Sequence, residues 1–178
     1  SIPQDGMAFF PKDGAKCEEL FEKFDGNKLM FGMDDGGIYM SAQNIEVGAT
    51  GSEFELVCSD GSSVHCVAKL LGIHNIMNIL GCAACARYMG MEMQDIANGI
   101  AKAEPVEHRL QLIDPGNGVL IIDDAFNSNP AGTRAAMDVL SRITGSRKRC
   151  ITKGMVEMGE TEAKENRAYG TPQDGFCD

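Results

Sequence analysis

Hydrophobic positions change their spacing along the chain, and each spacing predicts a different kind of element. Residues 6–10 form a short apolar run typical of a buried strand, and residues 15–24 place apolar side chains on one face of an amphipathic helix. Another strand is predicted over 28–33. The chain therefore begins with a strand, a helix and a strand, as expected of an α/β fold.

Residues 38–71 follow a different pattern, in which apolar and polar residues alternate in short runs between turns rich in Ser, Asp and Gly. This alternation predicts an antiparallel section of the sheet, with a hairpin across 59–62. His65 alternates with apolar neighbours and is interpreted as a half-exposed strand residue rather than a ligand. Helices are predicted over 74–90, which is rich in small residues, and over 94–103, so we expect a mixed sheet with helices packed on it.

A polar cluster follows four consecutive apolar residues in the segment 118–130. Such a run predicts a strand buried on both faces of a parallel sheet, and the residues after it lie at the carboxyl end, where open α/β sheets bind ligands. The alternative is that Asp124 and Asn127 only form an Asx-type turn. The cluster consists of Asp123, Asp124, Asn127 and Asn129.

The residues after this cluster predict a helix and a further strand. Asn129 is a good N-cap, and Pro130 fits the first turn of a helix, where its missing N–H is not needed. Apolar side chains recur at helical spacing over 131–143. We predict the next strand over 149–152 and a charged helix over 161–169.

Three polar residues, His74, Asn75 and Asn78, lie near the amino end of the small-residue helix. Residues 74 and 78 are four apart and share a helix face. Side-chain amides in this position can bind the edge of a nucleotide base through paired hydrogen bonds. The alternative is that Asn75 is the N-cap of the helix.

The segment 104–107 is the expected boundary between two domains, and a strand is predicted over 108–113. Arg109 lies at this boundary. Its guanidinium is a candidate to reach a phosphate or a ribose, and the alternative is an ordinary surface salt bridge.

Charge and hydropathy exclude several classes of protein. The formal charge is −10 and the 16 Lys and Arg residues are scattered, which argues against a nucleic-acid-binding surface. No apolar run is as long as a membrane span, and the polar start is unlike a signal peptide. Because the sequence begins without Met, on what looks like a loop before a strand, we expect it to be part of a longer chain.

Seven cysteines at irregular spacing predict free thiols in a reducing cytoplasm rather than a disulfide framework. Cys82 and Cys85 match a C-x-x-C pattern, but they lie in a predicted helix without a second pair at zinc spacing. We interpret them as residues of helix packing.

Four motifs combine these candidate residues in a fixed order and spacing. They are G-x-H-N-x-x-N from Gly72 to Asn78, H-R-L-Q from His108 to Gln111, D-D-A-F-N-S-N-P from Asp123 to Pro130, and G-M-V-E-M-G-E from Gly154 to Glu160. Together they resemble the Mur ligase family. The resemblance implies a cytoplasmic, ATP-dependent, amide-forming ligase of peptidoglycan precursor synthesis.

The resemblance also implies a domain organisation and a set of substrates. Residues 1–104 correspond to the carboxyl-terminal half of a central ATP-binding domain, and 105–178 to the first part of a Rossmann-like carboxyl-terminal domain. The most similar family member adds D-alanyl-D-alanine to UDP-N-acetylmuramoyl-tripeptide. These two molecules are therefore the implied substrates, with ATP and Mg2+ as cofactors.

The same resemblance assigns roles to residues that bind the nucleotide. Asn78 is expected to lie against the adenine, with His74 and Asn75 nearby. Arg109 is expected to reach the nucleotide from the linker, and Asp124 to bind the ribose or orient the closed state.

Two asparagines are implied in catalysis. Asn127 and Asn129 are expected to line the cleft where the incoming amino group meets the activated acyl group.

The sequence also departs from the family pattern. It contains no G-x-x-x-x-G-K-[ST] phosphate loop, residues 11–14 replace the usual Asn-x-Asp-Asp, and Lys153 stands where Pro or Gly is expected. We therefore expect a truncated chain without ligase activity of its own, with the main Mg2+ ligands upstream of residue 1. The alternatives are a sister enzyme, such as another Mur ligase or a folylpolyglutamate synthetase, and a non-catalytic nucleotide-binding module.

Overall fold

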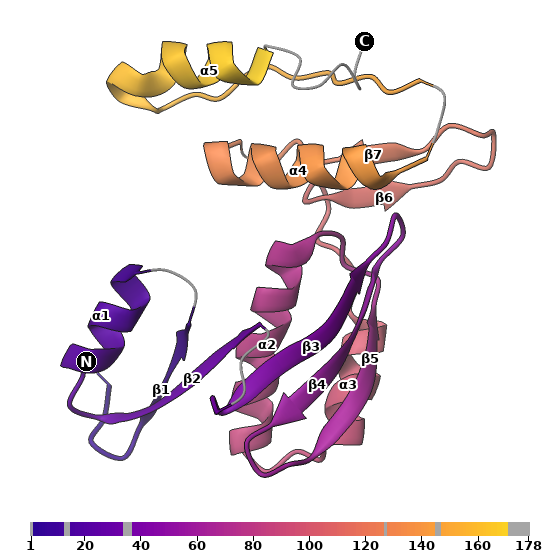
Figure 1. The fold of residues 1–178 in the computed structure, drawn as a ribbon. Coiled ribbons are helices and arrows are strands. Elements are labelled where there is room, and N and C mark those ends of the chain that lie inside the picture. The colour runs from indigo at the N-terminus through magenta and orange to yellow at the C-terminus, as the bar shows by residue number, and fades with distance from the viewer. Residues whose placement is uncertain (1, 13–14, 34–36, 127, 145–146, 171–178) are drawn as a thin grey trace.

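A five-stranded sheet forms the larger part of the molecule (Figure 1). The computed structural model describes residues 2–12, 15–33, 37–126, 128–144 and 147–170. The strands are, in sheet order, β1 (Met7–Pro11), β2 (Asn27–Met33), β3 (Met40–Val47), β4 (Ser52–Cys58) and β5 (Ser63–Ala68). β2 pairs in parallel with β1 and with β3, whereas β4 pairs antiparallel with β3 and with β5. The predicted mixed sheet with an antiparallel section is confirmed.

The first predicted helix is α1 (Ala15–Lys23), which connects β1 to β2. The ring of Phe10 lies 5.5 Å from that of Phe21, edge to face, and 5.8 Å from that of Phe24. These aromatic contacts fix the apolar face of the helix on β1. Leu20, which the spacing places on the same face, is 58% exposed.

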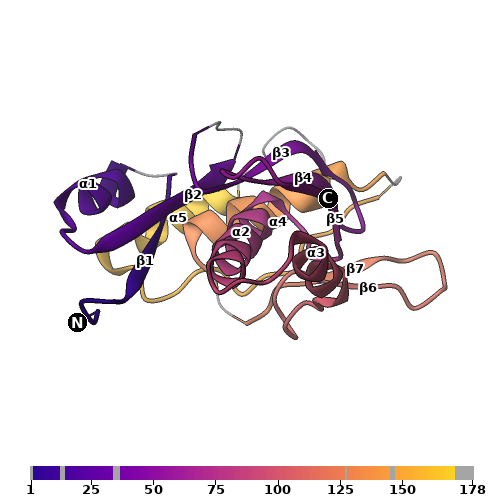
Figure 2. The same cartoon turned by 90° about the horizontal axis from the view of Figure 1, so that it is seen from below.

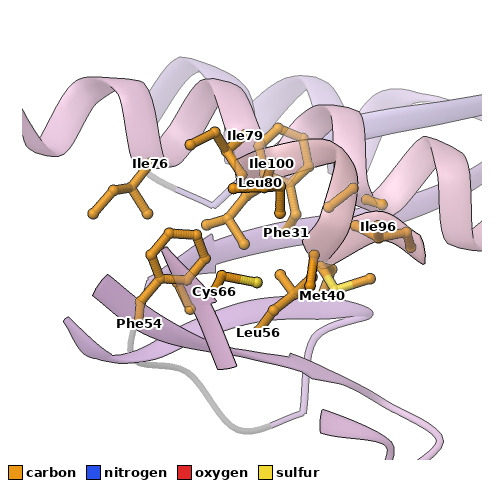
Figure 3. Packing of buried hydrophobic residues seen from close by; sticks show 14 of the residues in the cluster. Phe31, Met40, Phe54, Leu56, Cys66, Ile76, Ile79, Leu80, Ile96 and Ile100 are labelled. Atoms are coloured by element: carbon orange, nitrogen blue, oxygen red, sulfur yellow. The ribbon is translucent and has the colours of Figure 1, made fainter. Parts of the chain in front are cut away.

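Two helices, α2 (Ile73–Tyr88) and α3 (Met93–Lys102), cover one face of the sheet (Figure 2). Phe54 and Leu56 alternate inward along β4, and Cys66 of β5 pairs with Phe54. Figure 3 shows these side chains pointing toward Leu80 of α2, which is fully buried. The main hydrophobic core therefore lies between the sheet and the two helices.

Small residues let α2 approach the sheet closely, as the sequence predicts. Ala83 and Ala84 are buried in the core, and a Cβ added at Gly81 would lie 3.2 Å from the ring of Phe31. A larger residue at position 81 would have to displace that ring.

The predicted hairpin across 59–62 is confirmed, and side chains attach it to α2. Asp60 accepts a hydrogen bond from the Ser62 N–H at 2.8 Å, and Gly61 takes a φ of 85°. Arg87, near the end of α2, donates to the Asp60 carboxylate at 2.7 Å. The Ser62 hydroxyl and the Arg87 guanidinium together hold the pKa of Asp60 well below its usual range.

A second, smaller part follows α3. It contains β6 (Gln111–Ile113), β7 (Ile121–Asp123), α4 (Pro130–Arg142), a 3-10 turn (Gly159–Thr161) and α5 (Glu162–Gly170). The predicted helices near 131–143 and 161–169 are confirmed, each within about a turn of its expected bounds.

Two strand predictions for this part are wrong. The run 118–122 contributes to β7, but β7 pairs antiparallel with β6 in a two-stranded sheet, and Leu120 and Ile121 are 43% and 46% exposed. In the described residues, β6 is the only strand that pairs with β7. Of the apolar run, Ile122 is the residue that packs against the second hydrophobic cluster. Residues 149–152 form no strand, and Ile151 is 98% exposed.

The segment 153–158 pairs with no strand in the described residues, and the side chain of Asn166 binds its backbone instead. Its side-chain amide accepts from the Met155 N–H and donates to the Met155 carbonyl, both at 2.7 Å. The amide thus satisfies both backbone groups of one loop residue, which α5 holds in place.

A small second core joins the two parts of the chain. Leu71, just before α2, packs with Leu110 of the linker and with Val139 of α4, and all three are buried. In Figure 1 one end of α2 meets the layer formed by β6, β7 and α4. No helix in the described ranges has the length and hydropathy to cross a membrane.

Replacing Leu80 should test the position of the main core. We expect Leu80→Ala to lower the free energy of unfolding by about 2–5 kcal/mol, because it leaves a cavity between α2 and the sheet. The matched control is Leu20→Ala, which removes an exposed side chain and should cost less than about 0.5 kcal/mol. Urea unfolding followed by circular dichroism measures both, and equal losses would contradict the placement of the core.

Candidate functional site

The amino end of α2 is built around a glycine that no other residue can replace without strain. Gly72 is the N-cap of the helix and has a φ of 85°. A Cβ there would lie 2.8 Å from Cε1 of His74 and 3.3 Å from the Val139 side chain. The alternative that Asn75 is the N-cap is therefore wrong, because the helix begins two residues earlier.

His74 and Asp124 come from distant segments and interact across the junction. The pKa of His74 is lowered by burial, an effect that the charge of Asp124 opposes. Burial raises the pKa of Asp124. Two effects oppose this rise: the Leu110 N–H donates to the carboxylate at 3.1 Å, and the charges of His74 and Arg109 lie nearby. In both groups burial outweighs attraction, so each is shifted toward its neutral form.

One ring nitrogen of His74 is enclosed beside Gly72 at the amino end of α2. Nδ1 is buried and makes no hydrogen bond within the described part of the chain. A buried polar atom in this state usually has a partner, such as water or a bound molecule.

Asn75 and Asn78 form a short relay of side-chain amides. Asn75 Nδ2 donates to the Leu71 carbonyl at 2.8 Å, and Asn78 Nδ2 donates to Asn75 Oδ1 at 3.2 Å. The relay fixes the orientation of the exposed Asn78 amide, whose oxygen and second N–H remain as one acceptor and one donor. This pair matches the donor and acceptor on the edge of an adenine base.

Asn78 also lines an apolar groove between α2 and α3. The groove has a volume of about 320 Å³ and includes Ile79, Ala83 and Ile100. It reaches Ala103, the residue that follows α3, so it extends toward the linker that carries Arg109.

Arg109 is stacked on an aromatic ring. Its guanidinium lies 4.4 Å from the centroid of Phe126, a cation–π distance. The Phe126 N–H donates to the His108 carbonyl at 3.1 Å, which fixes this ring beside the linker. The alternative of a simple surface salt bridge does not describe this contact. Sequence reasoning missed Phe126, although the D-D-A-F motif contained it.

The linker has an unusual backbone, held by Asp123, the last residue of β7, and by Asp124, which follows it. His108 and Leu110 have φ values of 63° and 45°, which cost about 1–3 kcal/mol each in a non-glycine residue. His108 Nδ1 is 2.8 Å from Asp123 Oδ2, and Asp124 accepts from the Leu110 N–H. The two carboxylates thereby hold the linker in this strained form.

In the described residues of this cluster, the Asx-type hydrogen bond is made by Asp123 rather than by Asp124. Asp123 accepts from the Ala125 N–H at 3.2 Å, whereas Asp124 points to the linker. Asn129 is the N-cap of α4, since its side chain accepts from the Gly132 N–H at 2.8 Å, as predicted. Asn127 lies outside the described residues.

The comparisons with known proteins agree with the motifs. A family model for the Mur ligase middle domain matches residues 1–86. The chain is 31% identical over 164 residues to UDP-N-acetylmuramoyl-tripeptide–D-alanyl-D-alanine ligase of Escherichia coli, which covers 91% of this chain. The chain belongs to the Mur ligase family.

The fold of the chain is also similar to solved structures of Mur ligases. MurF from Acinetobacter baumannii covers 95% of the chain with a TM-score of 0.83 and 28% identity. A MurF ligase from Thermotoga maritima, solved in complex with ADP, covers 94% with a TM-score of 0.77, and its 20% identity supports the fold alone. The chain spans 36% of the E. coli ligase, 36% of the Acinetobacter chain and 38% of the Thermotoga chain.

The His108–Asp123 pair should make stability depend on pH. The pKa of His108 is raised from 6.5 and that of Asp123 lowered from 3.8, each chiefly by their mutual hydrogen bond. The contribution of His108 is complete below pH 6.5 and is lost as the pH rises through its raised pKa. That of Asp123 is present above pH 3.8 and is lost as the pH falls through its lowered pKa.

We therefore expect wild type to exceed His108→Gln in melting temperature by the largest margin near about pH 5, and by less at about pH 9. Asp123→Asn and the double variant complete the cycle that isolates the pair. A margin that stays constant over this range would show that the pair does not titrate as the geometry requires.

Proposed function

We propose that this chain is part of an ATP-dependent ligase that joins D-alanyl-D-alanine to UDP-N-acetylmuramoyl-tripeptide in peptidoglycan precursor synthesis. The observation that carries this proposal is the likeness to the E. coli ligase of that name, which extends over 91% of the chain. The likeness includes both parts of the chain and the junction between them. ATP with Mg2+ is the proposed cofactor, and the cytoplasm is the proposed location.

The proposed contribution of residues 1–178 is the adenosine side of the nucleotide site. The oriented amide of Asn78 lies beside an apolar groove, which suits a flat base that needs one donor and one acceptor. Asn75 supports it through the relay, and His74 lies one turn before Asn78 on the same helix face. These groups fit an adenine nucleotide.

Arg109 and Asp124 are proposed to bind the rest of the nucleotide from the linker side. A guanidinium is the side chain best suited to pair with phosphate, and a carboxylate can accept from ribose hydroxyls. Burial raises the pKa of Asp124, so a partner that donates hydrogen bonds to it would stabilise its charged form. The ligase reaction forms an acyl phosphate that an amine then attacks, and these residues would position the nucleotide for it.

The domain boundary is proposed to lie at residues 104 and 105. The main core ends at Ile100 of α3, and the second core begins with Leu110 in the linker, joined to the first part by Leu71. Asn129, and with it Asn127, is proposed to line the cleft where the amine enters. The cap bond of Asn129 uses Oδ1, which leaves its side-chain N–H groups for a substrate.

The test of the proposed function is phosphate release by the complete gene product that contains this chain. With ATP, Mg2+ and UDP-N-acetylmuramoyl-tripeptide, we expect release that depends on added D-alanyl-D-alanine. Residues 1–178 alone serve as a parallel sample in which we expect none. Release that requires a different amine would replace the proposed step with a sister ligase, and no release with any amine would favour a non-catalytic nucleotide-binding module.

Replacing Asn78 should weaken nucleotide use without changing the fold. Loss of hydrogen bonds to the base predicts a KM for ATP about 2- to 10-fold higher in Asn78→Ala, with kcat nearly unchanged. The matched control is Asn98→Ala, an exposed asparagine on α3 that pairs with Gln94 and does not line the groove. Equal KM values for wild type and Asn78→Ala would remove Asn78 from the proposed base site.

A further inference from the structure

The carboxyl end of α2 exposes two free thiols that the sequence predicts to be packed. Cys82 and Cys85 are both free and exposed, so the interpretation of this pair as helix packing is wrong. They lie three residues apart on a helix and therefore share one face, with Cβ atoms about 5–6 Å apart. Two thiols at this spacing can bind one metal ion without any change in the helix.

Two methionines complete the surroundings of the thiols. An open hollow of about 630 Å³ is lined by Cys82, Cys85, Ala86, Met89, Gly90 and Met91. Met89 is 80% exposed and Met91 46% exposed, so both thioether groups can be reached from solvent. All four side chains in this hollow that are larger than a methyl group carry sulfur.

The end of the helix holds Met91 close to the thiols. Gly90 has a φ of 93°, its N–H donates to the Arg87 carbonyl at 2.9 Å, and the Met91 N–H donates to the Ala86 carbonyl at 3.0 Å. These two bonds form a Schellman motif, in which the residue after the glycine folds back over the last helical turn. The backbone of Met91 thereby lies beside Ala86, and its side chain lines the same hollow as Cys85.

Arg87 braces this turn. Its guanidinium donates to the Met91 carbonyl at 3.2 Å and to the Asp60 carboxylate at 2.7 Å. The turn is thus attached to the β4–β5 hairpin, and the four sulfur-bearing residues sit on a supported backbone.

We propose that this hollow is a binding site for a soft monovalent metal ion, Cu(I), held by the Cys82 and Cys85 thiolates and by thioether sulfur from Met89 or Met91. Thiolate and thioether ligands select soft ions such as Cu(I). Zn²⁺ prefers four nitrogen or sulfur ligands, and no group of three or more His, Cys, Asp or Glu able to hold a metal occurs in the described ranges. Binding releases the thiol protons, so the affinity rises with pH.

This hollow adjoins the groove of the proposed base site, with which it shares Cys82, Ala86 and Met91 as lining residues. It lies at the carboxyl end of α2, whereas Gly72 and His74 lie at the amino end. The Cu(I) titration is carried out without nucleotide, so its outcome does not depend on whether the proposed ligase function holds.

The test is Cu(I) titration of the reduced, purified protein under anaerobic conditions, in competition with the chromogenic chelator bathocuproine disulfonate. We expect one tightly bound Cu(I) per chain. Cys82→Ser with Cys85→Ser should abolish this binding, and Met89→Leu with Met91→Leu should weaken it by about tenfold or more. Because all four residues are exposed, circular dichroism should show an unchanged fold in each variant.

The matched control is Cys17→Ser with Cys150→Ser, which removes two thiols from other parts of the molecule and should leave Cu(I) binding unchanged. Zn²⁺ in place of Cu(I) should bind with much lower affinity. Cu(I) binding that survives in the Cys82/Cys85 variant, or that is equally reduced in the Cys17/Cys150 variant, would overturn the proposal. So would retention of full affinity in the methionine variant.

Discussion

The packing of Leu71 against Leu110 and Val139 is the contact on which the candidate site depends. It joins the segment before α2 to the linker and to α4, and so brings His74 and Asp124 to one junction. Each buried leucine or valine contributes about 1.5–3 kcal/mol, a small sum beside the main core between the sheet and helices α2 and α3. The junction is therefore the part of the molecule where the two units can change position at the lowest cost.

Burial controls the charge state at this junction more strongly than attraction does. The pKa of His74 is lowered and that of Asp124 is raised, although the two groups would favour each other's charged form. Desolvation by burial explains the direction of both shifts. A charged ligand entering there would reverse the balance, because it supplies partners that the protein alone does not.

Sequence reasoning succeeded where one local pattern decides the structure. Helical spacing, alternation and turn residues predicted the order of elements from β1 to α4, and the capping chemistry of Asn129 was correct. It failed where the outcome depends on distant contacts. The exposure of Leu120 and the absence of a strand over 149–152 follow from which strands are available to pair, and the N-cap at Gly72 follows from a close approach to His74 and Val139. The Phe126 ring beside Arg109 likewise required the folded chain. Whether the predicted residues bind the nucleotide stays a prediction.

If Arg109 binds phosphate as proposed, its stacking on Phe126 has a consequence for how tightly the anion is held. A free arginine side chain loses about 2 kcal/mol of rotamer entropy when it is immobilised. On the aromatic ring, part of this freedom is already lost before any ligand arrives, so less of the binding free energy is spent on ordering the side chain. The ring also keeps a cation in place on a chain whose net charge of −10 would otherwise draw it toward other carboxylates. For the proposed phosphate, the ring has already fixed a cation that offsets the repulsion from the chain's net negative charge.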